Sequence, residues 1–318
     1  MTAYVLRRIL YAVPIIFGVT VICFTLVYLA PGDPLQTLLP EDATAETIQM
    51  VKEAYGFDKP IPVQYFVWLG NALTGDLGIS IATGRAVLDE IAGALVNTIM
   101  LAVAAVLLAF TLAFALGIVA GYTAGSALDR AVTGFAVVGV SVPNYWLGIV
   151  LVIIFSVEMM WLPATGMGPD GSANFNVFNP EHLTYMVMPV ITLSLIPIGI
   201  IARTTRAAVA EVLNQDFVQT LRAKGLSEGQ VGVHVVKNAL PQALAVMGLQ
   251  FGYLMGGSIL VETVFTWPGT GFLLNKAILT RDIPVLQGTI LVLALIFVLT
   301  NLLVDILQSL VDPRMQRG

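Results

Sequence analysis

The residues able to do chemistry in this sequence are few and far apart. There are two histidines, His182 and His234, and one cysteine, Cys23, which lies inside an apolar run. A lone cysteine forms neither an internal disulfide nor a thiolate metal site. An intramembrane enzyme needs a nucleophile with a nearby base, or a set of metal ligands. These residues supply neither, so we expect no catalytic residue and no metal or cofactor bound by this chain.

The sequence also has no phosphate-binding loop of the form Gly-x-x-x-x-Gly-Lys followed by Ser or Thr. The pair Lys224-Gly225 has these residues in the opposite order. The chain therefore cannot hydrolyse ATP by that route. If it takes part in ATP-driven transport, the motor must be another chain.

Two acidic residues near the ends of long apolar runs are functional candidates, because charge within a membrane is costly. We expect Asp305 to be an interfacial anchor paired with Arg314 or with a basic residue of segment 203–238. Glu262 either gates a route or caps the turn Trp267-Pro268-Gly269, and we favour the cap. The segment that begins at this turn is too short to span, and it either dips back into the bundle or lies flat outside.

Composition predicts the surroundings of these residues. Of 318 residues, 57% are hydrophobic and 11% are charged, and the mean hydropathy is +0.88. Soluble proteins carry about 25% charged residues. The excess of apolar surface indicates a protein of the lipid bilayer. The net charge of −5 argues against a nucleic-acid partner, which would favour a basic surface.

Six apolar runs are candidates for membrane spans, each of which takes roughly 20 residues. The runs are 9–30, 94–121, 131–157, 185–202, 239–261 and 285–310. The first is longer than the apolar core of a signal peptide, which is about 7–15 residues. Prolines inside the later runs are tolerated in membranes but make kinks. We therefore predict an all-α membrane protein with six transmembrane helices.

The basic residues predict the orientation, because cytoplasmic loops are enriched in Lys and Arg. With both termini in the cytoplasm, five of the 15 basic residues lie outside: Lys52, Lys59, Arg85, Lys276 and Arg281. The other ten lie inside: Arg7, Arg8, Arg130, Arg203, Arg206, Arg222, Lys224, Lys237, Arg314 and Arg317. The reverse topology would place the dense cluster of basic residues from Arg203 to Lys237 outside. We therefore predict that both termini lie in the cytoplasm.

The first external loop, 31–93, is too long to be a simple connection, and we expect it to form a helical cap. Thr44 is suited to begin a helix that runs to Tyr55 and ends at Gly56. Pro60 and Pro62 open a second short helix.

The cytoplasmic loop 203–238 differs from the other loops. It predicts two short helices, the first at about 216–224, joined by an elbow at Gly225, where a residue with positive φ ends a helix. Ser227 and Gln230 have the spacing of a capping box for the second helix. Spacing alone leaves two interpretations: an interfacial helix that holds lipid headgroups, or a helix that docks into a groove on a soluble partner.

The loop resembles the cytoplasmic signature loop of ABC importer permeases. The residues that carry the resemblance are Asp216-Phe217-Val218-Gln219-Thr220-Leu221-Arg222-Ala223-Lys224-Gly225-Leu226 and Lys237-Asn238-Ala239-Leu240-Pro241. Gln219-Thr220-Leu221 replaces the Glu-Ala-Ala of the general pattern, and the stretch from Gly225 to Pro241 is a few residues longer. Both departures resemble the branch that imports dipeptides, oligopeptides, glutathione and nickel.

Further motifs extend the resemblance along nearly the whole chain and match the first of the two paired permeases. They are Pro31-Gly32-Asp33-Pro34, Gly75-Asp76-Leu77-Gly78 with Ser80, Val142-Pro143, Trp161-Leu162-Pro163, residues 262–271, residues 281–284, Gln287-Gly288, residues 301–305 and Asp312-Pro313-Arg314.

The resemblance implies a type I ABC importer permease fold in a single domain, 1–318, of a bacterial inner membrane. It implies that a coupling helix contacts the ATPase through Phe217, Thr220, Leu221, Arg222, Ala223, Lys224, Gly225 and Leu226. The implied partners are a second homologous permease, one or two ATPase subunits that bind ATP and Mg, and a periplasmic substrate-binding protein. The implied cargo is di- or oligopeptides or glutathione-like solutes.

In this family the fifth span lines the route, which would involve Met247, Gln250, Tyr253, Met255 and Ser258. Its glycines equally fit close helix packing. A different class of function, an ion-coupled secondary transporter, predicts buried charge relays and internal repeats. The sequence shows no convincing repeat and few charges in mid-membrane.

Overall fold

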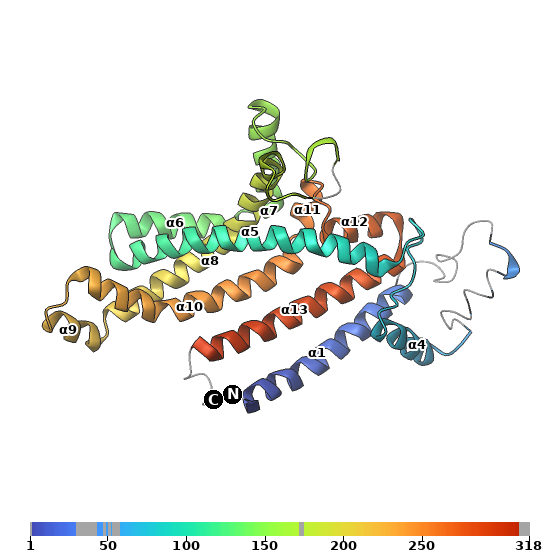
Figure 1. Ribbon diagram of the computed structural model, residues 1–318, viewed down its shortest axis with the longest axis horizontal. Helices are drawn as coiled ribbons and strands as arrows, with labels where there is room; N and C mark the ends of the chain where they lie inside the picture. Colours follow the sequence, from blue (N-terminus) through green and yellow to red (C-terminus); the bar gives the residue numbers. More distant parts are fainter. Residues whose placement is uncertain are drawn as a thin grey trace.

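The protein is an elongated bundle of helices in a computed structural model that describes residues 2–29, 43–46, 49, 52, 58–171 and 175–311 (Figure 1). Within these residues the secondary structure is helical, apart from one isolated β-bridge between Ile79 and Ala86. The all-α class predicted from the sequence is therefore confirmed. Pro31-Gly32-Asp33-Pro34, the helix predicted from Thr44 to Tyr55, and Asp312-Pro313-Arg314 lie wholly or mainly outside the described residues.

Four single helices of the described part are long and apolar enough to cross a bilayer. They are α1 (Thr2–Leu29), α5 (Val87–Tyr122), α8 (Pro180–Leu213) and α13 (Ile283–Val311). A bent pair of helices makes a fifth candidate. Helix α10 (Glu228–Gly257) runs beside them in the bundle but is not among these candidates (Figure 1).

The third predicted run, 131–157, is not one straight helix. It is divided into α6 (Ala127–Ser141) and α7 (Asn144–Leu151), with a π-helical continuation, η1 (Val152–Glu158). The two parts are bent by 98°. Pro143 explains the break, because a proline disfavours the helical conformation of the residue before it. Val142 is indeed extended, with ψ of 125°.

The fifth predicted run, 239–261, has different limits in the structure. Helix α10 begins already at Glu228 and ends at Gly257, and after Ser258 the chain continues as the short α11 (Ile259–Val264). A turn leads to α12 (Thr270–Thr280), which packs against α5 and α13.

Helix α8 lies at the centre of the bundle, between α5, α6 and α10. Of its most apolar window 61% is buried, compared with 11% for α1 and 17% for α13. Glycines permit the close approach of its neighbours. A Cβ on Gly117 of α5 would lie 2.7 Å from the carbonyl oxygen of Ala202, and one on Gly199 of α8 would lie 2.5 Å from that of Ala136.

The second short helix predicted in segment 31–93 is present as α4 (Ile61–Leu73), which begins directly after Pro60. It packs against α1 through Tyr65, whose hydroxyl is 2.8 Å from the hydroxyl of Thr20. Tyr28 also donates a hydrogen bond to the side chain of Gln64. Helix α4 therefore lies along the end of α1.

We expect Gly199→Ala to destabilise the protein, because the added methyl group meets backbone atoms of α6 that cannot move aside. Overpacking of this kind costs about 1–3 kcal/mol. Thermal unfolding of the purified protein in detergent would measure the loss.

The matched control is Gly134→Ala on α6, where a Cβ meets nothing within 4 Å. Equal unfolding temperatures for the two variants would contradict the close packing of α6 on α8.

Candidate functional site

One end of the bundle carries a helical elbow between α9 (Asp216–Ala223) and α10. Gly225 has φ of 83°, and its N–H donates to the carbonyl of Arg222 at 2.9 Å. The N–H of Leu226 donates to the carbonyl of Leu221 at 3.3 Å. This pair of bonds is the Schellman motif, which ends a helix on a left-handed residue. The elbow predicted at Gly225 is confirmed.

The second arm of the elbow starts with the predicted capping box. The N–H of Ser227 donates to Oε1 of Gln230 at 2.9 Å, and the N–H of Gln230 donates to Oγ of Ser227 at 3.4 Å. Both arms are therefore defined by local bonds within the chain.

The elbow is anchored to the bundle by a small apolar cluster. Val218 of α9 is fully buried against residues of α8 and α10 such as Val209 and Val231. The predicted coupling residues divide into two groups. Phe217, Leu221 and Leu226 are half-buried against this cluster, and Thr220, Arg222, Ala223, Lys224 and Gly225 form the exposed outer face.

A bidentate ion pair spans the elbow. Arg222 Nε lies 2.9 Å from Oε1 of Glu228, and its second nitrogen lies 3.1 Å from Oε2. The hydrogen bonds from Arg222 lower the pKa of Glu228 below its ordinary value. The pair is solvent-exposed, so its contribution to stability is small. The sequence analysis did not identify Glu228, because the two residues face each other only once the chain has turned at Gly225.

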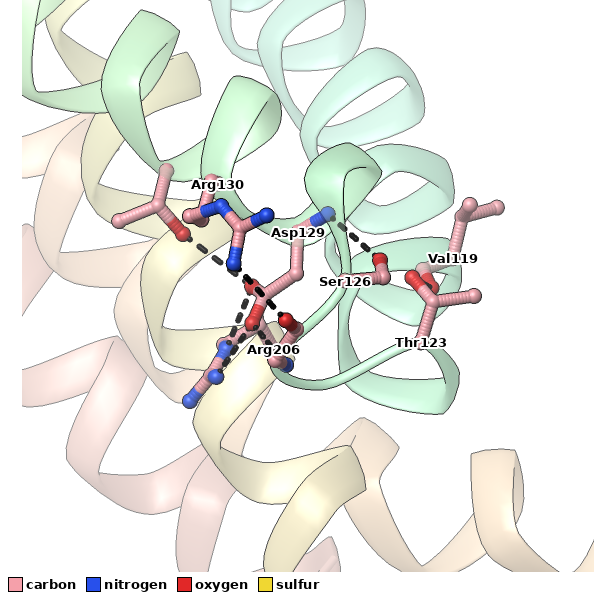
Figure 2. Close-up of polar contacts among 8 residues, drawn as sticks. Val119, Thr123, Ser126, Asp129, Arg130 and Arg206 are labelled. Carbon is pink, nitrogen blue, oxygen red and sulfur yellow. Dashed lines mark hydrogen bonds and ion pairs between the residues drawn. The ribbon is translucent and has the colours of Figure 1, made fainter.

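A second ion pair lies beside α8 at the same end of the bundle. Asp129, in the first turn of α6, accepts two hydrogen bonds from Arg206 of α8 at 2.9 and 2.7 Å (Figure 2). It also accepts one from the N–H of Gly125. Sequence analysis missed this pair. The spacing of Ser126 and Asp129 was the available signal, since an acid three residues after a Ser marks a helix start.

A different polar cluster lies at the opposite end, around Glu262, whose side chain is fully buried. Its carboxylate accepts hydrogen bonds from the hydroxyls of Ser258 at 2.8 Å and Thr98 at 2.9 Å. It also accepts from the N–H groups of Gly271 at 2.7 Å and Phe272 at 3.1 Å. These N–H groups open α12, where a negative charge is favourable. The carboxylate therefore caps the start of α12, directly after the turn Trp267-Pro268-Gly269 that we expected it to cap.

The turn before α12 folds onto the bundle. Trp267 is fully buried in the main core, and its ring N–H donates to the carbonyl of Asn97 at 3.1 Å. Asn97 in turn donates to the carbonyl of Pro268 at 2.9 Å. A Cβ on Gly269 would lie 2.4 Å from the carboxylate of Glu262, so only glycine fits there. From the sequence, this segment could either dip back into the bundle or lie flat outside it. In the structure Trp267 packs inside the bundle.

The five residues predicted to line a route do not share one surface. Met255 and Ser258 are buried within this chain, and Met247 and Gln250 are half-buried. Only Tyr253 is exposed, at 47%. The exposed residues of this region are Leu249, Tyr253 and Gly256 on α10 and Leu260 on α11. A helix turns once every 3.6 residues, so residues close in sequence can lie on its buried and its exposed face. The prediction of route residues did not take this into account.

Asp305 pairs with Arg8 of α1 at 3.0 Å, and not with the signature loop as considered from the sequence. The pair forms because α1 packs along α13. Arg314, the other predicted partner, lies outside the described residues. Within the described part of the chain, no cluster of three or more His, Cys, Asp or Glu residues could hold a metal ion.

Comparison with known proteins covers nearly the whole chain. Residues 113–317 match the family described as "Binding-protein-dependent transport system inner membrane component", and residues 1–102 match the N-terminal part of such components. The dipeptide transport system permease protein DppB of Alkalihalophilus pseudofirmus is 40% identical over 332 aligned residues, covering 99% of this chain and 100% of its own.

Two other relatives have comparable similarity. A putative peptide transport system permease protein of Brucella abortus is 40% identical, with 99% of each chain covered. The glutathione transport system permease protein GsiC of Escherichia coli is 38% identical, with 98% of each chain covered. The names of these relatives give no support to the alternative of an ion-coupled secondary transporter.

We expect Glu262→Gln to lower stability by about 2 kcal/mol, because both N–H groups of α12 bond the same carboxylate oxygen, Oε2, and a neutral amide oxygen in its place lacks the charge that strengthens these bonds. Chemical unfolding in detergent would measure this. Glu158→Gln is the control, because Glu158 is exposed at the end of η1. Equal stability of the two variants would show that the carboxylate is not required.

The pair of Asp129 and Arg206 is suited to a double-mutant cycle. We expect Asp129→Asn and Arg206→Gln each to destabilise the protein, and the double variant to lose less than their sum. Coupling of about 0.5–3 kcal/mol is typical of residues in direct contact. Strict additivity in the measured unfolding free energies would refute an energetic link between α6 and α8.

Proposed function

The chain belongs to the family of binding-protein-dependent transport system inner membrane components and is a permease subunit of an ABC importer, and from this premise we propose its cargo, partners and mechanism. With a second homologous permease it forms a route for di- or oligopeptides or glutathione-like solutes. A periplasmic binding protein delivers the solute. One or two partner ATPase subunits bind ATP and Mg and drive the cycle.

The proposal of a peptide cargo is supported by three relatives whose names specify dipeptide, peptide and glutathione transport, at 38–40% identity over nearly the full length. Dipeptides and glutathione share a peptide bond and carry both ammonium and carboxylate groups. A cargo of this chemistry fits all three names.

The elbow at Gly225 is the observation that best supports the coupling mechanism. Its exposed face carries Thr220, Arg222 and Lys224, and its inner face is packed against α8 and α10. A partner that binds the outer face and moves therefore displaces two long helices, α8 and α10, at the same time. In the proposed cycle, ATP closes the partner subunits, the elbow moves with them, and α8 and α10 open the route outward until hydrolysis resets it.

We propose that the chain crosses a bacterial inner membrane six times, with both termini in the cytoplasm. Four single helices, the bent pair of α6 and α7–η1, and α10 would make up the six spans. The start of α1 and the end of α13 lie toward the end of the bundle that carries α9, which supports termini on the same side as the elbow (Figure 1). This end includes the basic residues Arg203, Arg206, Arg222 and Lys224.

The proposed assembly is tested by gentle affinity purification of the chain from its native membrane, followed by reconstitution in vesicles. We expect a homologous permease and ATPase subunits to copurify. ATP-driven uptake of a labelled dipeptide should require the binding protein. A chain that is recovered alone and transports without ATP would overturn the proposal.

Gly225→Val should reduce the ATPase activity stimulated by loaded binding protein by about tenfold, because a β-branched residue is strained at φ of 83°. The measurement is ATP hydrolysis by the reconstituted complex. Gly229→Val is the matched control. Both glycines have open space around the position of a Cβ, and only Gly225 has positive φ.

The basal ATPase rate, measured without binding protein, separates failed coupling from failed assembly. Stimulation that is unchanged in Gly225→Val would show that the shape of the elbow does not transmit the signal.

A further inference from the structure

The end of the bundle opposite the elbow contains a cavity of about 620 Å³. It lies between the turn at 80–85, the first turns of α5 and one face of α12. Small-molecule sites in proteins usually have volumes of about 300–1,000 Å³. The cavity is therefore large enough for a small peptide.

The walls of this cavity are held in place by hydrogen bonds between distant segments. Asp282, at the start of α13, is only 3% exposed. It accepts from the hydroxyl of Ser80 at 2.6 Å and from the N–H of Ala82 at 3.1 Å. It also accepts from the N–H of Val285 at 3.3 Å. The turn that carries Arg85 is thus fixed to α13, which makes the cavity a preformed site.

Opposite charges line the cavity on different walls. Arg85 and Glu90 face each other at 3.7 Å, and Thr83 donates to Glu90 at 2.5 Å. Asp89 on α5 and Lys276 on α12 also line the cavity and are exposed. Neither has an ion-pair partner among the residues that the structure describes.

We propose that this cavity is an external receiving site for zwitterionic peptides, in which Lys276 binds the carboxylate and Asp89 the ammonium group. The inference rests on the proposed peptide cargo. Because Lys276 and Asp89 lie on two walls and have no ion-pair partner, they can form ion pairs with the carboxylate and the ammonium group of one peptide. A simple anion or cation would leave one of them without a partner. Met100 and Phe272 also line the cavity and offer apolar surface to the peptide's side chains.

The position of the cavity connects a bound peptide to the rest of the molecule. Pro268 and Gly269 line it, and they belong to the turn held by Asn97 and by the carboxylate of Glu262. Glu262 lies on α11, which continues directly from α10. A peptide in the cavity therefore lies against the segment that connects α12 to the helix starting at the elbow.

The test uses the assembled complex without binding protein, with the reporter Thr280→Cys. Thr280 lines the cavity, and the native Cys23 is fully buried. The rate of maleimide labelling is measured against increasing concentrations of dialanine. We expect dialanine to protect the reporter, and N-acetyl-dialanine amide, which lacks both charges, to protect at least fivefold more weakly.

Charge variants assign the two ends of the peptide. Lys276→Gln should raise the half-protecting concentration of dialanine about five- to tenfold, and Lys276→Arg should restore it. Asp89→Asn should have a similar effect on dialanine but none on N-acetyl-dialanine, which has no ammonium group. Lys59→Gln, an exposed charge outside the cavity, is the matched control and should change nothing.

Equal protection by the blocked and the free peptide would overturn the inference. So would protection that is insensitive to both charge variants, or protection that appears only when the binding protein is added. ATP-driven dialanine uptake by the same complex, measured after the binding protein is added back, separates this result from the proposed function. Uptake without protection refutes the receiving site alone, and absence of uptake refutes the peptide cargo.

Discussion

The close contact of α8 with its neighbours is the constraint on which the rest of the structure depends. Gly117 and Gly121 of α5 and Gly199 of α8 bring backbones so near that a Cβ at any of the three would overlap its neighbour. Protein interiors packed in this way transmit displacement rather than absorb it. Because α8 also leads directly into α9, a shift of the elbow must be shared by α5 and α6. The ion pair of Asp129 and Arg206 reinforces the same contact at the elbow end.

The apolar surroundings make a break in a helix costly unless its polar groups find partners within the protein. Backbone groups in lipid must be satisfied within the protein. The break after α10 and α11 is compensated by Glu262, which accepts from two N–H groups of α12. Pro189 and Pro197, by contrast, remain within α8, whose window is the most buried of the candidate spans. Neighbouring helices support it there.

The parts of this architecture that could be predicted from the sequence are those determined by local rules. The elbow followed from Gly225 and from the spacing of Ser227 and Gln230, and α4 followed from Pro60. Contacts between distant residues could not be predicted in this way. Asp129 meets Arg206, and Arg8 meets Asp305, only because particular helices lie side by side. The buried and the exposed face of α10 likewise could not be distinguished until its neighbouring helices were known. The bend at Pro143 was foreseeable as a kink, but its angle depends on packing.

The self-contained geometry of the elbow has a consequence for how this protein can evolve. The bonds that shape it run between backbone groups and between Ser227 and Gln230, whereas the side chains of Ala223 and Lys224 are exposed and take no part in them. If the exposed face binds the ATPase as proposed, mutations on that surface can alter which ATPase is recognised without changing the fold of the elbow. Recognition and transmission would then be encoded by separate residues of one short segment. A duplicated copy of the gene could acquire a new motor by drift at these surface positions alone.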